Sequence, residues 1–530
     1  MSEPVLLVLG LAAAVAFAVV AKRLMLPYPI VFVLAGTALA FIPGLPPVTI
    51  APDWIFLVVL PPLLFSGGWT TDAVLLRQNL APVLRLAVIL VVVSTVAVAM
   101  LAQRIVPGLG WDAAVVLGAI VSPPDAVAAS ATFQRFSVPR RIVAILEGEA
   151  LVNDATALVI YAFAVAAVVA GGFSVQRAAM QFVIVALGGI AAGIAIEWCV
   201  EKLTLALHRF ELSDSLIDNL IVIGTPYAAY LTGQSLHVSG VLATVVAGIL
   251  LGRRSAVLHS PETRLVGGNV WELWLYVVNA FIFLTIGLQL RGLVHDGARA
   301  LALLPAALAI SALLIVVRLA WVWASVSVQR WYAKAFAKHD ATPRNAEALI
   351  VGWSGMRGIV SLAAALALPF AGPHGAAFPG RDAIVFITFV VIFVTLVGQG
   401  LTLIPLLKWL RVGGESDTEQ REIEVRVAAL QGGLQKIEQI FAEAHDEEER
   451  EIVDRLRDEY AHRIQHLRSH GTKGGRAHET ALSRFDHHAQ DEALRAERRA
   501  ITRLRDEGKI PDDIFRRVQY DLDLAEARLY

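Results

Sequence analysis

Cysteine and charge are both scarce in this chain of 530 residues. Cys199 is the single cysteine, and charged residues make up only 17% of the sequence. A lone cysteine excludes an intrachain disulfide and gives no further information about the redox compartment. We find no glycine-rich nucleotide loop and no nucleic-acid-binding motif. The sequence therefore gives no reason to expect a cofactor, a resident metal or a nucleic-acid partner.

Hydrophobic residues are abundant, at 56% of the chain with a mean hydropathy of +0.63. Charge is distributed unevenly, with a net of +6 over residues 1–411 and −7 over residues 412–530. This pattern predicts a membrane domain over residues 1–411, followed by a soluble acidic tail over residues 412–530. The first apolar run follows Met-Ser-Glu-Pro and lacks the basic region of a cleaved signal peptide, so we expect it to be retained.

Apolar runs of spanning length recur through the membrane domain, separated by short polar breaks. They predict an all-α polytopic protein with about thirteen transmembrane helices, which cover residues 5–21, 29–42, 54–66, 82–103, 112–132, 142–170, 178–207, 215–234, 237–252, 270–290, 301–328, 345–368 and 382–407.

Basic residues near the ends of these runs indicate an orientation. With the N-terminus outside, eighteen Lys and Arg residues lie at cytoplasmic ends and five at outer ends. The two that remain, Arg318 and Arg357, lie within spans. This bias favours thirteen crossings and a cytoplasmic C-terminal tail.

Two predicted spans are interrupted by their own residues. Ser122-Pro123-Pro124-Asp125 places two prolines in the fifth span, and the segment from Gly352 to Gly358 places three glycines and an arginine in the twelfth. Irregular backbone at membrane depth is tolerated where it is buried in protein or lines a cavity. A matched pair of such breaks favours two inverted repeats with a binding site at their crossing. Ordinary proline kinks and glycine packing positions are the alternative.

Glu149 and Asp154 are two carboxylates of the sixth span. An acid within a membrane helix needs a partner or a wet cavity, so it is either a functional group or the buried partner of a basic group. Asn153 adds a neutral donor and acceptor beside Asp154. At ~1.5 Å per residue, Asp125 lies ~20 Å from the outer start of its span, and Asp154 and Arg357 lie ~18 Å from the inner starts of theirs. All three are near the middle of a ~30 Å apolar layer.

The residues from Glu147 to Asp154, from Ser122 to Val127 and from Trp353 to Leu362 resemble the monovalent cation:proton antiporter-1 family, in its NhaP-like bacterial branch. The resemblance covers roughly residues 5–410. It implies electroneutral exchange of Na⁺ or K⁺ for H⁺, alternating access by a moving core, and a homodimer in the cell inner membrane. These transported ions are substrates, and no catalytic residue is expected.

The resemblance also implies roles for individual residues. Asp154 matches the aspartate that binds the cation or the proton, and Asp125 matches the one that holds the cation or the backbone around it. The glutamate of the motif pairs with a mid-membrane arginine, which implies a structural pair of Glu149 and Arg357. A proton and a cation cannot both occupy Asp154, so exchange follows from competition at one carboxylate.

The sequence departs from the family at three positions. Ser66 replaces a glutamate that helps to coordinate the ion, Ala150 replaces a serine, and Pro124 replaces a threonine while keeping its backbone carbonyl. Fewer hard oxygen ligands leave more water on the ion. We therefore expect a modest preference for Na⁺ over K⁺, and the sequence does not rank these ions with Li⁺.

Two other functions are compatible with parts of the sequence. Gly352-Trp353-Ser354-Gly355 fits the pattern of rhomboid-like intramembrane serine proteases, but a serine nucleophile needs a histidine base. His237 is the only span-associated candidate and lies at an outer helix end. A cation channel that uses the same cavity is the other alternative.

The tail reads as one long charged helix from about Thr418 to Ser469, a break at Gly471 to Gly475, and further helix after it. His462, His466 and His470 recur every fourth residue and share one helical face. They could sense pH or bind metal, although a solvated surface is the simpler interpretation. The sequence from Leu522 to Leu529 is similar to the ending of many bacterial members of the family.

Overall fold

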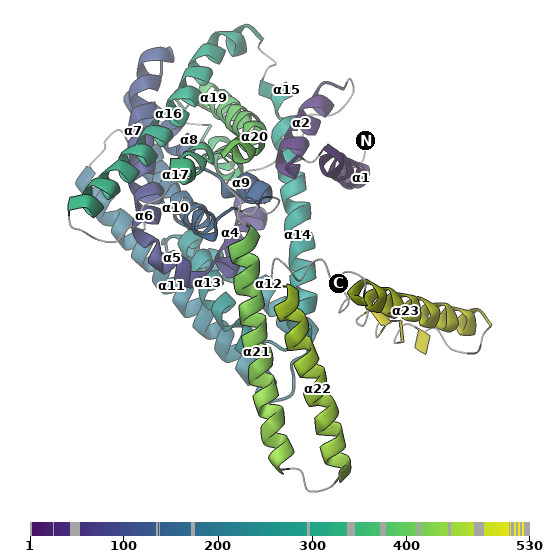
Figure 1. Cartoon of the computed structure of the whole chain (residues 1–530). Coiled ribbons are helices and arrows are strands. Elements are labelled where there is room, and N and C mark those ends of the chain that lie inside the picture. Colours follow the sequence, from purple (N-terminus) through teal and green to yellow (C-terminus); the bar gives the residue numbers. More distant parts are fainter. Residues whose placement is uncertain are drawn as a thin grey trace. The chain divides into compact units, whose positions relative to one another are not determined.

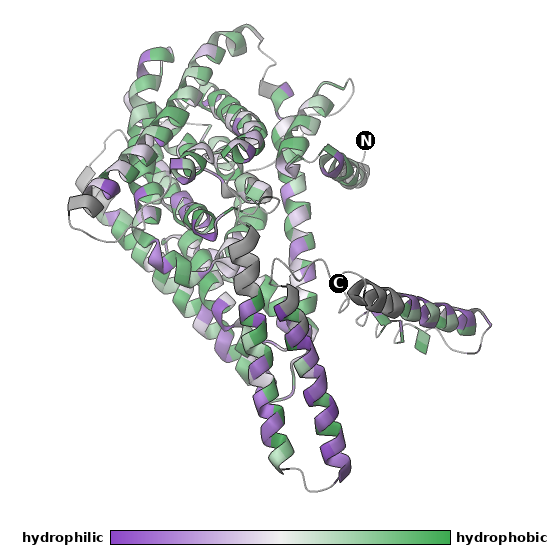
Figure 2. Cartoon of the chain, in the orientation of Figure 1, coloured by the Kyte–Doolittle hydropathy of each residue, from purple (hydrophilic) through white to green (hydrophobic). Residues whose placement is uncertain are grey.

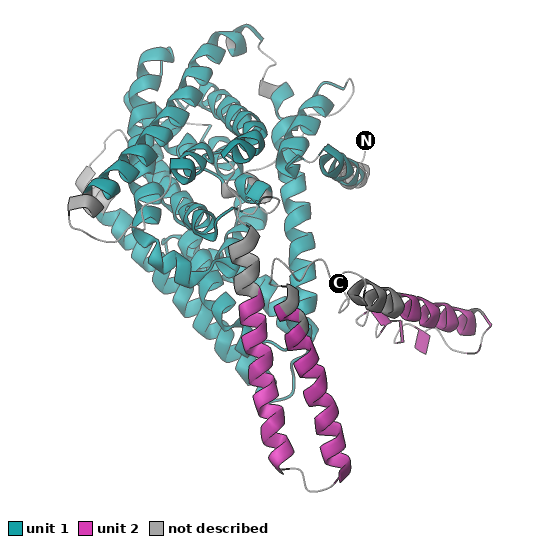
Figure 3. Ribbon diagram, in the orientation of Figure 1, with its two compact units in different colours: residues 1–413 teal, residues 414–530 magenta. Residues whose placement is uncertain are grey.

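A computed structural model describes the chain apart from residues 1–2, 25, 43–53, 134–135, 137, 171–174, 294–296, 336–344, 371–377, 411–414, 444–446, 471–481, 508, 510–513, 516–517, 520–521 and 524–530. The described residues are helical, with turns and short extended links between the helices (Figure 1). They form two compact units, residues 1–413 and residues 414–530 (Figure 3). The functional assignment of these two parts remains a prediction from composition.

The first unit is built from long apolar helices. Its elements are α1 (Glu3–Leu24), α2 (Tyr28–Ala40), η1 (Ile55–Val59), α4 (Leu60–Thr70), α5 (Ala73–Gln78), α6 (Leu80–Leu84), η2 (Arg85–Leu90), α7 (Val91–Ile105), α8 (Trp111–Val121), α9 (Ala126–Phe133), α10 (Arg140–Ala170), α11 (Val175–Arg209), α12 (Ser215–Ser235), α13 (Gly240–Leu258), α14 (Pro261–Leu288), α15 (Leu290–Leu293), α16 (Gly297–Ala335), α17 (Asn345–Trp353), α18 (Ile359–Leu366), α19 (Arg381–Phe393), η4 (Val394–Gln399) and α20 (Gly400–Leu410).

Each predicted span coincides with one of these helices, or with consecutive helical segments joined by a break or a π-helical turn. Among the described residues, seven helices are long and apolar enough to cross a membrane by themselves. Shorter apolar helices cover residues 28–40, 55–70 and 111–121. The prediction of a polytopic all-α protein is confirmed, and the number of crossings stays a prediction.

Helix starts in this unit follow local capping chemistry. Asp214 accepts a hydrogen bond from the Ile217 N–H at 2.8 Å and begins α12, and Ser239 accepts one from the Leu242 N–H at 3.1 Å and begins α13. Ser260 caps α14, and Pro261 occupies its first turn, where no N–H is needed. The predicted start of this span at residue 270 was therefore nine residues too late, because the first turns of α14 are polar.

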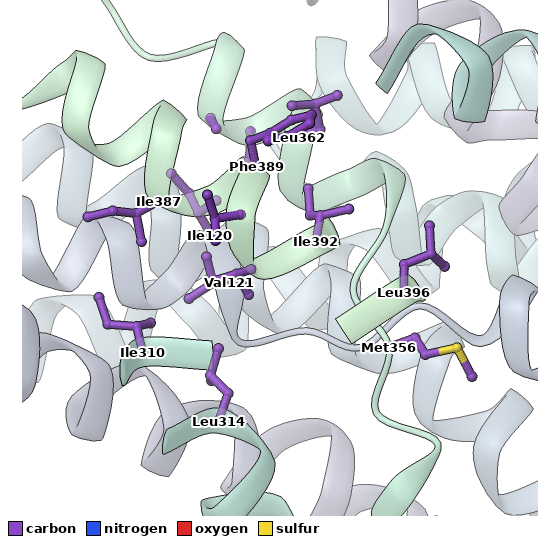
Figure 4. Close-up of a cluster of buried hydrophobic side chains, with 14 of the residues drawn as sticks. Ile120, Val121, Ile310, Leu314, Met356, Leu362, Ile387, Phe389, Ile392 and Leu396 are labelled. Atoms are coloured by element: carbon purple, nitrogen blue, oxygen red, sulfur yellow. The ribbon is translucent and has the colours of Figure 1, made fainter. Parts of the chain in front are cut away.

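The core of the first unit surrounds the two interrupted helices. Figure 4 shows buried side chains from several elements converging there: Ile120, Val121, Ile310, Leu314, Met356, Leu362, Ile387, Phe389, Ile392 and Leu396. At another contact, α2 and α14 approach so closely that a Cβ on Gly36 would collide with the Leu284 carbonyl. Glycine is required there by backbone proximity.

The second unit contains α21 (Glu415–Glu443), α22 (Glu447–His470) and α23 (Leu482–Asp506). Hydrophilic residues are frequent along α21 and α22 (Figure 2). These two helices pack against each other, so the prediction of one continuous helix was wrong. Val427, Val453 and Ile464 are buried in this unit, which shows that apolar positions within the charged sequence are covered by packing.

Several predictions for the tail fall partly outside the described residues. His462 is exposed, which fits a solvated surface, whereas the side chains of His466 and His470 are not described. The predicted break at Gly471 to Gly475 and residues 524–529 of the terminal motif also lie outside the described part.

Candidate cation site at the crossing of two broken helices

The two interrupted spans meet at their breaks. The first break separates α8 from α9, and the second separates α17 from α18. The backbone N–H of Asp125 donates to the Met356 carbonyl over 2.6 Å, which joins the two breaks directly. The expectation of discontinuous, crossing helices is confirmed.

Local sequence explains why the helices stop here. Pro123 and Pro124 remove two backbone donors from the first break. In the second break, a Cβ on Gly358 would collide with the carboxylate of Asp125, and one on Gly355 would collide with the side chain of Arg318. The missing side chains at these two positions let charged groups approach the backbone closely.

Asp125 binds the starts of two half-helices. Its Oδ1 accepts from the Val127 N–H at 2.8 Å, in the first turn of α9. Its Oδ2 accepts from the Ile359 N–H at 3.4 Å, at the first residue of α18. A carboxylate is stabilised by free N–H groups and by the positive end of a helix dipole. Asp125 therefore holds the crossing together as well as lining the cavity described below.

Two buried arginines bind carbonyls at the opposite ends of the broken helices. Arg357 donates through Nε to the Val121 carbonyl at 3.2 Å, where α8 ends, and through Nη1 to the Gly355 carbonyl. Arg318 on α16 donates through Nε to the Val351 carbonyl at 3.2 Å, near the end of α17. Cations are stabilised at helix C-termini, so the arginines complement the role of Asp125.

The partner of Glu149 is Arg318, and the predicted pair of Glu149 with Arg357 is wrong. Arg318 Nη1 and Nη2 donate to Glu149 Oε1 and Oε2 at 2.5 and 2.7 Å. Both side chains are almost completely buried. The two parallel hydrogen bonds satisfy both carboxylate oxygens, a geometry that only arginine offers. Arg357 is instead held by backbone carbonyls.

A cavity of about 670 Å³ lies beside the crossing. Its walls include Asp125 and Pro124 from the first break, Asp154 and Ala150 from α10, and Ser66 from α4. The structure thus brings together five of the residues singled out in the sequence. Glu149 and Arg357 do not line this cavity and have the structural contacts described above.

Asn153 supports the cavity wall from behind. Its side chain is fully buried, and its Nδ2 donates to the Pro124 carbonyl at 2.7 Å. This bond ties α10 to the first break beside Asp154. The Oδ1 atom of Asn153 has no hydrogen-bond partner within the described part of the chain.

Arg318 lies in a predicted span, but no sequence motif assigns it a role. A charged residue in an apolar helix already indicated a buried partner. No sequence motif indicates the cavity walls from α2 and α14, which contribute Tyr28, Trp271 and Asn279. These residues carry no motif, because tyrosine, tryptophan and asparagine are ordinary in membrane helices.

The protease alternative is not supported by the geometry. The Ser354 hydroxyl is buried and donates to the Ile350 carbonyl at 2.7 Å, as helical serines commonly do. His237 is exposed beyond the end of α12. In the described residues, no group of three or more His, Cys, Asp or Glu side chains is arranged to hold a metal ion.

Comparisons with known proteins identify the family of this chain. Residues 10–409 match the family described as "Sodium/hydrogen exchanger, transmembrane". An uncharacterised Na⁺/H⁺ exchanger of Mycobacterium tuberculosis, Rv2287, is 31% identical over 99% of this chain and 96% of its own length. A sodium, potassium, lithium and rubidium/H⁺ antiporter of Bacillus subtilis is 29% identical over 96% of this chain and 75% of its own length.

The fold has a counterpart among solved structures. The sodium/proton antiporter MjNhaP1 from Methanocaldococcus jannaschii matches 76% of this chain and 97% of its own, with a TM-score of 0.55 and 18% identity. That likeness concerns the fold alone. The family match over residues 10–409 and the 31% identity to Rv2287 over 99% of this chain show that the chain belongs to the sodium/hydrogen exchanger family and is a multi-pass cation/proton antiporter, not an enzyme.

Proposed function

We propose that the chain exchanges one monovalent cation, Na⁺ or K⁺, for one proton, and that both compete for the carboxylate of Asp154. The proposal rests on which carboxylates at the crossing already have hydrogen-bond partners. Asp125 accepts two backbone N–H groups, and Glu149 is held by Arg318. Asp154 lines the cavity and makes no hydrogen bond or ion pair with the described residues. Its oxygens are available for an ion.

The charges at the crossing support one-for-one exchange. Asp125, Asp154 and Glu149 contribute three negative charges when ionised, and Arg318 and Arg357 contribute two positive charges. The group therefore has a net charge of −1 when empty. One cation or one proton on Asp154 makes it neutral, and a neutral group is far less costly to move through a low-dielectric layer than a charged one. Moving the empty, charged site is costly in free energy. This cost couples the cation flux to the proton flux.

The residues around Asp154 favour weak discrimination between cations. Ser66 and Ala150 line the cavity where the family has a carboxylate and a hydroxyl, so the ion has few hard protein ligands. A weaker electrostatic field at the site removes less water from the ion. The site therefore discriminates less strongly against the larger K⁺. The Bacillus subtilis relative is named for four alkali cations: sodium, potassium, lithium and rubidium. K⁺/H⁺ exchange is therefore the second candidate function.

Exchange is tested by the dequenching of a pH-sensitive dye in everted vesicles, with Na⁺, K⁺ and Li⁺ added in turn. We expect proton flux with Na⁺ and a comparable flux with K⁺. Asp154→Asn should reduce the flux with every cation to background, because the amide neither binds a proton in this pH range nor carries charge.

Asp112→Asn is the matched control, since it makes the same chemical change at an exposed position in the first turn of α8. It should leave exchange unchanged. Both variants are checked for membrane insertion and thermal stability. Cation-driven proton flux at the wild-type level in folded Asp154→Asn would show that the shared site lies elsewhere. Cation flux without proton flux in the wild type would indicate a channel.

The remaining parts of the proposal rest on the family resemblance and on the distribution of basic residues. We place the protein in the plasma membrane as a homodimer, with the N-terminus outside and the C-terminal tail in the cytoplasm. A core that includes the crossing would move to give alternating access, and the activity would serve pH homeostasis.

A further inference from the structure

We propose that Glu147 is a further carboxylate on the path of the cation to Asp154, and that it sets the apparent affinity of the exchanger for its cation. This inference rests on the proposed function of Asp154. Glu147 belongs to the motif that marked the family resemblance, but neither that resemblance nor the contacts described above give it a role.

One face of α10 lines the cavity. Glu147, Ala150, Leu151 and Asp154 all contribute to the cavity wall. Their spacing of three, four and seven residues places them on one side of a helix. Glu149 lies two residues beyond Glu147, which puts it on a different face, and it binds Arg318 outside the cavity. The two glutamates of the motif therefore lie on different faces of α10. Glu147 lines the cavity, and Glu149 is paired with Arg318.

Glu147 has no partner in the described structure. It makes no hydrogen bond or ion pair with any described residue, although it lies within a helix of membrane-spanning length and is partly buried. An acid of this kind in an apolar helix is costly unless it faces water or an ion. Glu147 is one of the residues that line the cavity, so it has access to the water or the ion inside.

The distance along the helix determines what Glu147 can do. Seven residues correspond to ~10.5 Å of helix rise, towards the N-terminal end of α10. An ion held directly by Asp154 is too far away to contact Glu147 as well. The glutamate instead attracts hydrated cations into the cavity and raises their local concentration, as a negatively lined cleft does. It should therefore affect cation capture and not the choice between dehydrated ions.

The test is the kinetics of Glu147→Gln in the full-length protein, reconstituted in proteoliposomes and supplied with Na⁺. We expect the apparent KM for Na⁺ to rise about three- to tenfold, with the maximal rate and the Na⁺/K⁺ ratio unchanged. The increase should shrink when a salt of a large, untransported organic cation raises the ionic strength. Glu147→Asp keeps the charge and should restore most of the affinity.

Glu262→Gln is the matched control. Glu262 is exposed in the first turn of α14 and does not line the cavity, so the same loss of charge should leave KM unchanged. An unchanged KM in folded Glu147→Gln would overturn the proposal. A loss of maximal rate that Glu147→Asp does not restore would also overturn it, because it would indicate a structural role. Absence of exchange in the wild type would instead contradict the function proposed for Asp154.

Discussion

Arg318 and Arg357 are both buried arginines in apolar segments, yet they stabilise different parts of the crossing. Arg318 neutralises Glu149 through two parallel hydrogen bonds, and Arg357 binds the carbonyls of a helix end and of a break. A buried ion pair contributes little net stability relative to apolar residues, but a single buried charge without its partner is strongly destabilising. The pair therefore constrains which substitutions the site tolerates.

A double-mutant cycle on Glu149 and Arg318 tests this pairing. Glu149→Gln and Arg318→Gln should each destabilise the protein by about 3–5 kcal/mol, because each leaves a lone buried charge. The double variant should cost clearly less than the sum. Thermal unfolding in detergent measures the three losses.

The matched control combines Glu149→Gln with Arg254→Gln. Arg254 pairs with Glu197 at 3.3 Å and is half exposed, so these two losses should add. Additive losses for Glu149 and Arg318 would contradict a functional ion pair between them.

The choice between the two arginines could not be made from the sequence. Glu149 and Arg318 lie on the regular helices α10 and α16, whereas Arg357 follows two glycines in a segment without helical periodicity. The direction of a side chain after such a break depends on backbone angles that composition does not determine. The positions of the breaks were predictable, because proline and glycine act locally.

At the scale of elements, the ends of α11, α12 and α13 meet in a polar cluster around the buried Asp218 and His259. Asp218 on α12 lies 3.0 Å from His208 Nε2 and 3.8 Å from His259 Nδ1, and it accepts from the Ser213 hydroxyl at 2.5 Å. The His259 ring stacks on Trp69. Arg264 of α14 donates to the His259 carbonyl at 2.5 Å. The sequence alone does not indicate this cluster, because His259 and Arg264 come from a segment distant from His208, Ser213 and Asp218.

Burial lowers the pKa of His259, and Asp218 opposes this effect only in part. The folded protein therefore binds a proton here less readily than the unfolded chain, where histidine titrates near ~6.5. The contribution of His259 to stability is fully present above that pH and is lost as the pH falls through it. His208 and Arg264 also repel a charged His259.

We expect wild-type thermal stability to fall between about pH 7.5 and pH 5.5, and His259→Gln to show a smaller fall over this range. Its absolute stability at pH 7.5 can differ, since the stacking on Trp69 is lost. The comparison is the slope of melting temperature against pH. Equal slopes for the two proteins would show that His259 does not control this acid sensitivity.

At the scale of the whole molecule, composition separated residues 1–411 from the tail, close to the division between the two compact units at residue 413. The apolar runs located the helices, since length and hydropathy alone determine them. The packing of α21 against α22 was missed, because a charged helix with a narrow apolar stripe also fits a single extended rod.

The charge balance of the crossing predicts how exchange responds to voltage. If the loaded group is neutral with either ion, the transported step moves no net charge, and the membrane potential does no work on it. The initial rate of Na⁺/H⁺ exchange should therefore be the same with and without a potential. A thiocyanate gradient across proteoliposomes sets the potential without adding a competing cation. A rate that changes with that potential would contradict one-for-one exchange.

The contact that joins the two breaks consists of main-chain atoms. The backbone N–H of Asp125 donates to the Met356 carbonyl, and every residue type except proline has such an N–H. Replacing the side chain at this position therefore does not remove the bond. The crossing also requires the absence of a side chain at Gly358, where a Cβ would collide with the Asp125 carboxylate. A crossing that is joined by main-chain atoms can tolerate extensive sequence divergence. This agrees with a fold that is shared at 18% sequence identity.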